Sequence, residues 1–416
     1  MPMLKKAAPL FLLLIALLLT SCWDAFDPDE MLHVWAIGVD RGLADKWRLT
    51  LLFSSLEELT GGGEDAGVSR QERSSKEDTI VIDAPSFFTG IDMLNSAIPR
   101  RLSFTHAQTI IFSEELAASG LVDNYIMPII RFRQIRKSAR VLVVKGAAQD
   151  FLEGVAPFAG SSVSEDLQFL GRESKNTGLS PVVTLNHFYT ALNSSYYQPI
   201  ATLAALNDFK SLPKEGEPWG TQFQTGGQYL AGALPRAGEG KVEFFGTALF
   251  RDGEMVGELN GDQTRFLLMV RGEFERGFFT VEDPKQPDLI IPLDVRALGE
   301  PRIRVKLQGN KALIDVAVRL DLDLLAVQSK LHYEQQPLKG LLEEKFQTIV
   351  RTGIEDVIRN CQSLNVDVFM FGNHTTKDFL TVPAAENFNW NERFQNAEIT
   401  VEVKAAIRRT GRQIVL

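Results

Sequence analysis

Apolar and polar residues alternate along the first half of the chain in short runs that favour strands separated by helices. The runs predict strands at residues 32–39, 48–53, 79–84, 109–112 and 140–144. Apolar residues three and four positions apart predict a helix over 86–98, which Ser86 would cap and Pro99 would stop. Further helices are expected at 114–119, at 122–133 and from residue 147. Such alternation indicates a mixed sheet flanked by helices.

The second half shows hairpin patterns and one long amphipathic helix. Strands at 242–250 and 254–259 flank Asp252-Gly253, and strands at 303–308 and 312–320 flank Gly309-Asn310. Apolar residues at helical spacing form a stripe over 338–362, and an alternating strand is expected at 397–407. The whole pattern predicts a multi-domain α+β protein, with mixed α/β regions in which antiparallel and mixed sheets are flanked by helices. It indicates neither a Rossmann nor a TIM-barrel architecture.

Polar breaks in the pattern predict the domain boundaries. Residues 59–78 contain three consecutive glycines among mixed charges, which is typical of a flexible loop. Residues 210–228 combine glycine, proline and charge, which is typical of a linker. We therefore expect an N-terminal α/β region at 32–209, in one or two subdomains, and a C-terminal α+β domain at 229–416.

The first residues of the chain have the pattern of a bacterial lipoprotein signal. Lys5 and Lys6 precede an uncharged apolar run, which ends in small residues directly before Cys22. The run is shorter than the roughly 17–25 residues of a membrane-spanning helix, so an uncleaved anchor is the weaker interpretation. We expect residues 1–21 to be a cleaved signal peptide and residues 22–31 to be a lipidated tether. Diacylglyceryl-Cys22 would hold the mature protein on the extracytoplasmic face of a membrane.

The overall charge argues against nucleic acid as a partner. The formal net charge is −9, and cleavage before Cys22 would remove two lysines. An acidic chain gains no counterion-release term from phosphate. Cys361 is the other cysteine of the chain, so no disulfide within one lipidated chain is expected. Its place in the apolar stripe predicts a buried thiol, in preference to a reactive one.

Signatures of catalysis and cofactor binding are missing or weak. The five histidines are isolated, and none stands in a zinc-binding motif. Gly61-Gly62-Gly63 lies in a polar setting with no amphipathic helix after it, which favours a loop over a dinucleotide site. We therefore expect no enzyme, no metal and no cofactor. A cell-surface hydrolase stays open as a minor alternative, although no nucleophile and base can be nominated.

One basic segment invites a functional interpretation in this acidic chain. Arg131, Arg133, Arg136, Lys137 and Arg140 place five cations within ten residues. A solvated helix face, or ion pairs with nearby acids, would explain them without any function. The alternative is that Arg131, Arg133 and Arg136 contact lipid headgroups or an acidic loop of a partner protein.

Several ordered motifs resemble one known family. They are Cys22-Trp23-Asp24, residues 36–40 (AIGVD), 101–121 (RLSFTHAQTIIFSEELAASGL), 131–136 (RFRQIR), 246–259 (GTALFRDGEMVGEL), 367–372 (DVFMFG) and 407–411 (IRRTG). The chain resembles the Ger(x)C lipoproteins, the C subunits of spore nutrient germinant receptors. It departs from the family pattern at Ala25-Phe26, where an Arg-Glu pair is common, and at Gln134, where an acidic residue is common.

The resemblance implies a lipid-anchored protein of mixed α/β structure on the outer face of the spore inner membrane. It would support germination without catalysis, through contacts with integral membrane receptor subunits of the A and B types. The germinant and the contact surface are not implied. The main alternative is a lipid-anchored solute-binding protein of a transporter, which would need two α/β lobes around a ligand cleft. The hairpin-rich second half fits that alternative poorly.

Overall fold

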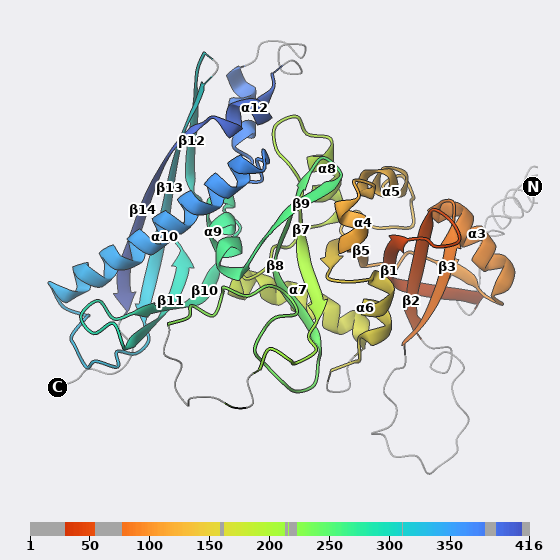
Figure 1. The fold of residues 1–416 in the computed structure, drawn as a ribbon, viewed down its shortest axis with the longest axis horizontal. Helices are drawn as coiled ribbons and strands as arrows, with labels where there is room; N and C mark the ends of the chain where they lie inside the picture. The colour runs from red at the N-terminus through yellow and green to blue at the C-terminus, as the bar shows by residue number, and fades with distance from the viewer. Residues whose placement is uncertain are drawn as a thin grey trace, which may run out of the picture.

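The computed structural model describes residues 30–54, 77–158, 162–212, 215, 223–309, 311–378 and 388–409. The predicted signal peptide at 1–21, Cys22 and the tether as far as residue 29 lie outside the described residues. So does most of the predicted loop at 59–78. The described elements form two sheets that follow one another along the longest axis of the molecule (Figure 1).

The first sheet has nine strands in the order β3-β2-β1-β5-β6-β7-β8-β9, with β4 paired to β1. Its strands are β1 (Met31–Arg41), β2 (Trp47–Ser54), β3 (Glu77–Ala84), β4 (Arg101–Ser103), β5 (Thr109–Ser113), β6 (Arg140–Val144), β7 (Ile200–Leu206), β8 (Val242–Arg251) and β9 (Glu254–Leu259). The central strands β1, β5, β6 and β7 run parallel, and the strands at both ends are antiparallel. The sheet is therefore mixed, as the sequence predicts.

Helices cover both faces of this sheet. They are α3 (Phe87–Ala97), α4 (Glu114–Ala118), α5 (Val122–Ile129), α6 (Ala148–Gly154), α7 (Val163–Thr177) and α8 (Leu185–Leu192). Alternate residues of the parallel strands enter separate cores, because successive side chains point to opposite faces. Phe112 joins the core of α3, α5 and α8, whereas Ile111 joins the core of α6 and α7. This double burial explains the continuous apolar runs of these strands.

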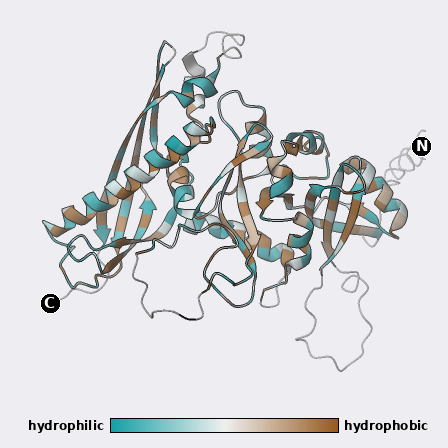
Figure 2. Ribbon diagram, viewed as in Figure 1, coloured by the Kyte–Doolittle hydropathy of each residue, from teal (hydrophilic) through white to brown (hydrophobic). Residues whose placement is uncertain are grey.

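The second sheet has five strands and one long covering helix. The strands are β10 (Arg276–Glu282), β11 (Ile290–Ala297), β12 (Arg302–Gln308), β13 (Lys311–Leu324) and β14 (Glu398–Arg409). β11 and β12 pair with successive parts of β13, and β14 runs parallel to β13 along its other edge. The helix α10 (Leu338–Ser363) crosses this sheet, with its apolar stripe buried (Figures 1 and 2).

Smaller elements complete the second half. They are α9 (Gly261–Arg271), the 3-10 helix η2 (Phe371–Asp378) and α12 (Trp390–Gln395). The helix α9 is buried on nearly every side, because Phe266 reaches Gly353 of α10 and Thr264 hydrogen-bonds Thr247 of β8. It therefore connects the two sheets through packed side chains.

The change of sheet does not coincide with the predicted linker at 210–228. The strand β7 before this segment pairs directly with β8 after it, so the first sheet continues to Leu259. A polar, glycine-rich break marks a connection at the surface, and such a connection can also join neighbouring strands of one sheet. The second sheet begins after α9, at β10.

One predicted helix is shorter than expected. The sequence pattern extends from 122 to 133, but α5 ends at Ile129, one residue after Pro128. Proline inside a helix removes a backbone donor and disrupts the turn before it. The basic segment that follows therefore lies in an irregular loop at 130–139, and the interpretation as a helix face is wrong.

Candidate functional site

The loop at 130–139 alternates inward-facing and outward-facing residues. Phe132 lies edge-on to the rings of Phe87, Phe88 and Phe104, at centroid distances between 5.5 and 5.9 Å. The side-chain oxygen of Gln134 accepts a hydrogen bond of 3.0 Å from the backbone N–H of Phe104. Ile135 is buried. These anchors fix the loop on the fold, and a glutamine at 134 has a structural role.

Four cations project from the anchored loop. Arg131, Arg133, Arg136 and Lys137 are all exposed. Within the part of the chain that the structure describes, none of their side chains has an ion-pair partner. The prediction that nearby acids pair with them therefore fails for the described residues. We call these four residues the basic loop.

Arg140 does not belong to this exposed group. Its guanidinium donates hydrogen bonds of 3.1 Å to the backbone oxygens of Leu167 and Gln168 in α7. Burial, with a smaller contribution from the charge of Arg172, lowers its pKa. Gly171 leaves room for the guanidinium, since a Cβ there would lie 1.7 Å from Nη1. Arg140 thus attaches α7 to the sheet.

A second site forms where three segments of the chain meet around Asp367. Its buried carboxylate accepts hydrogen bonds from the backbone N–H groups of Phe369 and Gly372, both at 2.9 Å, and from Nε1 of Trp390 at 2.7 Å. Burial raises the pKa of Asp367 to about 6, and the hydrogen bonds to its carboxylate oppose that rise. The carboxylate therefore organises the turn at 367–372.

The same turn is connected to the hairpin between β8 and β9. The backbone N–H of Gln198 donates to the backbone oxygen of Asp367 at 2.8 Å, and Oε1 of Gln198 accepts from the N–H of Asp252 at 2.7 Å. Asp252 has a φ of 55°, which suits its position in the tight turn. The motifs at 246–259 and 367–372, which are far apart in the sequence, are thus linked through one glutamine.

A groove of about 630 Å³ lies beside this junction. It is lined from α7, α8 and α9 and by Met370, and its polar residues include Lys175, His187, Tyr197 and Arg271. The guanidinium of Arg271 is already engaged, since Nη1 donates to the backbone oxygen of Val368 at 2.5 Å and Nε donates to Glu273 at 2.9 Å. The groove lies between α7 and α8 of the first half and α9 of the second, and Arg271 attaches α9 to the turn at 367–372.

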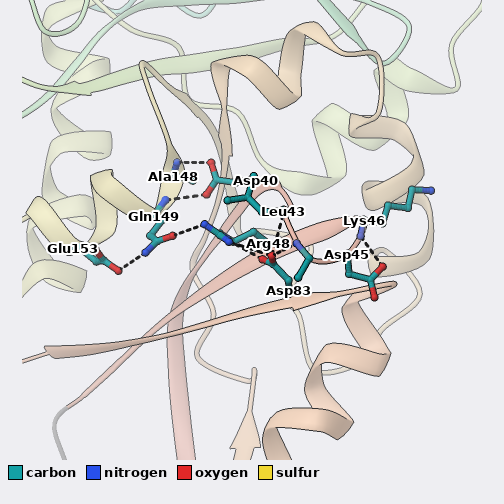
Figure 3. A network of polar contacts seen from close by, with 10 residues as sticks. Asp40, Leu43, Asp45, Lys46, Arg48, Asp83, Ala148, Gln149 and Glu153 are labelled. Carbon is teal, nitrogen blue, oxygen red and sulfur yellow. Dashed lines mark hydrogen bonds and ion pairs between the residues drawn. The ribbon is translucent and has the colours of Figure 1, made fainter.

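A third polar network explains the motif at 36–40. Asp40 of β1 accepts hydrogen bonds from the N–H groups of Ala148 and Gln149, at 2.8 and 3.0 Å, and so caps α6 from a distant strand (Figure 3). Arg48 of β2 reaches Asp83 of β3 at 2.8 Å. The hydrogen bonds from Arg48 come first among the causes that hold the pKa of Asp83 far below its usual range. This network is structural.

Catalytic and metal-binding arrangements are not found among the residues described. No three His, Cys, Asp or Glu side chains there are placed to share a metal ion. His33 and His106 lie with ring centroids 4.5 Å apart, and burial together with His106 lowers the pKa of His33. The Cys361 thiol is buried as predicted, and burial raises its pKa. In the described ranges, no helix combines the length and apolarity needed to cross a bilayer.

Two family models match the chain in succession. The model named Spore germination protein N-terminal domain matches residues 24–206, and the model named Spore germination B3/GerAC like, C-terminal matches residues 245–411. The chain belongs to the GerAC-like family of spore germination proteins. The unmatched stretch 207–244 contains the predicted linker, so the two models divide this GerAC-like chain near 210–228 although its first sheet continues beyond that point.

Relatives match this GerAC-like protein over almost its full length. Spore germination protein YndF of Bacillus subtilis (strain 168) is 20% identical, covering 98% of both chains. Spore germination protein KC of the same strain is 19% identical, covering 98% of this chain and 96% of its own. The crystal structure of the GerBC protein superposes with a TM-score of 0.52 at 15% identity, over 89% of this chain and 96% of that one. This likeness confirms the multi-domain α+β fold.

Sequence reasoning identified the basic residues but missed the junction around Asp367. The sequence does contain a signal for a buried carboxylate, because Asp367 lies between Val366 and Val368 in an apolar run. A carboxylate in such a run needs a hydrogen-bond partner. Its partner Trp390 is 23 residues further along the chain. No local pattern connects that tryptophan, or Gln198, to the aspartate.

Proposed function

We propose that this GerAC-like protein is a lipid-anchored, non-enzymatic subunit of a spore nutrient germinant receptor. It acts through protein contacts with integral membrane subunits of the A and B types, on the extracytoplasmic face of the spore inner membrane. The observation that carries the proposal is the pair of germination-family matches at 24–206 and 245–411, and the predicted lipoprotein signal at 1–21 before Cys22 supports it.

The roles of the buried ionisable groups support a function without catalysis. Asp367 organises a turn, Asp40 caps α6, and Arg265 stacks on Phe279 while donating to the backbone oxygen of Thr177. A catalytic acid or base needs a perturbed pKa and access to substrate. The pKa of Asp367 is perturbed, but its carboxylate is enclosed by the N–H groups that donate hydrogen bonds to it.

The decisive experiment combines mass spectrometry of the N-terminus with affinity capture from spore membranes. Wild type is compared with Cys22→Ala, and Cys361→Ala serves as the matched control because that thiol is buried in α10. We expect acyl mass on Cys22 in wild type and in the control, together with capture of polytopic receptor subunits. Cys22→Ala should lose both. A lipidated chain that captures transporter subunits, or no membrane protein, would overturn the receptor role and leave the anchor standing.

The solute-binding alternative is tested by ligand-induced stabilisation. A solute-binding protein should gain thermal stability with its ligand in the absence of any partner. The second half of this chain is an antiparallel and mixed sheet covered by α10, which is unlike the second α/β lobe that such a protein needs. A screen of small solutes against the isolated protein is therefore expected to give no stabilisation, and a saturable shift would support the alternative.

A further inference from the structure

The basic loop lies at the same edge of the first sheet as the point where the chain enters the fold. The strands β1, β5, β6 and β7 are parallel, so their amino ends meet at one edge. The chain enters β1 there at Met31, which pairs with Arg101. The basic loop leads into β6 at that edge, because Arg140 is in register with Thr109 of β5. We call this edge the amino edge.

The separation between the two features is small. β5 is the single strand between β1 and β6, so the loop lies about two strand spacings, roughly 10 Å, from the line of β1. The eight residues 23–30 can span at most about 25–30 Å. A lipid on Cys22 would therefore keep the amino edge close to the bilayer surface.

The segments that lead into the parallel strands beside β1 carry no acidic side chain. The segments that lead into β5, β6 and β7 at this edge are residues 104–108, 130–139 and 193–199, and none contains Asp or Glu. The basic loop supplies four exposed cations there. Acidic residues at other points of this edge are Glu30 at the start of β1, Asp78 at the start of β3, and Asp252 and Glu254 in the hairpin between β8 and β9, and Asp92 is exposed on α3. The tether sequence adds Asp24, Asp27 and Asp29.

We propose that the basic loop docks on anionic lipid headgroups of the bilayer that holds the Cys22 lipid, and so fixes the orientation of the protein on the membrane. This inference rests on the proposed lipid anchor. Polybasic segments next to a membrane attachment gain affinity from anionic lipids, because each cation adds to the attraction. The two acyl chains of a diacylglyceryl group already hold a protein on a membrane, so the basic surface would contribute its orientation.

Two observations favour lipid over an acidic protein loop. The four cations are exposed while the anchoring residues of the loop face the fold, so the charges are accessible to headgroups, and Arg136 also lines a small hollow of about 190 Å³. Phe88, which is 40% exposed, packs against Phe132 of the loop and adds an aromatic ring beside the cations. Aromatic rings next to cations are typical of surfaces that sit at the level of the headgroups.

The test uses the full-length lipidated protein in vesicles of phosphatidylcholine, with or without phosphatidylglycerol. Ser138 is exposed within the loop, and Ser138→Cys carries an environment-sensitive dye. Cys361 stays unlabelled because it is fully buried, and the Cys22 sulfur carries the lipid. Headgroup contact is read as quenching of the dye by brominated lipid. The triple variant R131Q/R133Q/R136Q is compared with R302Q/R304Q/K306Q, which removes the same charge from exposed positions of β12 in the second sheet.

We expect quenching in anionic vesicles that decreases with salt. Loss of three cations, each contributing about fivefold, should lower the docking equilibrium constant more than tenfold, whereas the β12 variant should change it less than twofold. Equal quenching in neutral and anionic vesicles, or no effect of the loop variant, would overturn the inference. So would quenching that requires co-purified receptor subunits, which would assign the loop to a protein partner.

The anchor is read separately, by mass spectrometry of Cys22. If Cys22 is acylated but quenching does not depend on charge, the docking inference is wrong and the proposed anchor stands. If Cys22 carries no acyl group, the anchor fails, and docking is then read as co-sedimentation with anionic vesicles. The loop variant and the β12 variant are compared in the co-sedimentation measurement as well.

Discussion

Asp367 shows how one residue can couple the stability of this fold to pH. Its folded-state pKa is about 6, against an ordinary value of 3.8, because burial penalises the charged form more than the hydrogen bonds favour it. Between these two values the folded protein holds a proton that the unfolded chain has lost. The contribution of Asp367 to stability is therefore largest below about pH 4, falls by roughly 3 kcal/mol as the pH rises to about 6, and is constant above.

Replacing Asp367 by asparagine should remove this pH dependence. We expect the free energy of unfolding of Asp367→Asn to improve relative to wild type by roughly 3 kcal/mol between about pH 4 and pH 7. One backbone N–H also loses its carboxylate oxygen, so the variant should be the less stable protein at the acidic end. Urea denaturation across this range gives both results. Parallel pH profiles for the two proteins would contradict the assignment.

Gly372 should not tolerate a larger residue. A Cβ at this position would lie 2.1 Å from the backbone oxygen of Tyr196 and 2.8 Å from the ring of Trp390. We expect Gly372→Ala to lower the free energy of unfolding by at least about 2 kcal/mol, because neither neighbour can move without disturbing the junction.

Gly340→Ala is the matched control for that substitution. Its new Cβ would meet the flexible side chain of Gln336 at 3.0 Å, on the first turns of α10. Alanine favours a helix over glycine by up to about 1 kcal/mol, so this variant should be neutral or more stable. Equal losses in the two variants, measured by thermal denaturation, would argue against a specific clash at Gly372.

At the scale of elements, the sequence predicted those helices and strands whose apolar residues recur at a regular spacing. The stripe over 338–362 predicted α10, and the structure buries Leu342, Phe346, Val350, Ile354, Val357, Ile358 and Cys361 along it. The apolar pattern did not predict β7, β10, β11, α7, α8 or α9. The helix α9 is buried all round, so its apolar residues form no stripe, whereas β10 alternates buried and exposed positions but has the apolar Phe278 on its exposed face. Periodicity cannot detect a helix such as α9 that is buried on all its faces.

The stripe of α10 gives a test of how the second sheet is stabilised. Phe346 is fully buried, and its ring lies edge-on to Phe279 of β10 at 5.6 Å. Phe346→Ala should lower the free energy of unfolding by about 3–5 kcal/mol through lost contacts and a cavity. Glu344→Ala, on the exposed side of the same helix, should stay within about 0.5 kcal/mol. Similar values for the two variants in urea denaturation would mean that α10 is not held by this stripe.

At the scale of the molecule, strand order was beyond the reach of the sequence. The pairing of β7 with β8 across residues 210–228, and of β13 with β14 across more than 70 residues, depends on partners that no local pattern names. The two family models leave residues 207–244 between them, yet the buried core runs continuously from Leu32 in β1 to Ile407 in β14. The basic residues were found from composition, whereas their exposure depended on where α5 ends.

The continuous core predicts that both sheets unfold together. Because α9 contacts β8 on one side and α10 on the other, loss of either sheet would expose its apolar surface. We expect one calorimetric transition, with the core amides of β5 and of β13 exchanging hydrogen at the same free energy. Two transitions, or slow exchange confined to one sheet, would show that the regions matched by the two family models are independent units.

The direction of the first sheet has a consequence for the height of the protein above the bilayer. Its strand order runs along the longest axis of the molecule, and the second sheet continues in the same direction (Figure 1). The amino edge therefore extends across the first sheet in that direction. A protein resting on that edge would lie with its long axis parallel to the bilayer, so its footprint on the membrane would be broad. Neighbouring membrane proteins could then contact it from the side along much of its length.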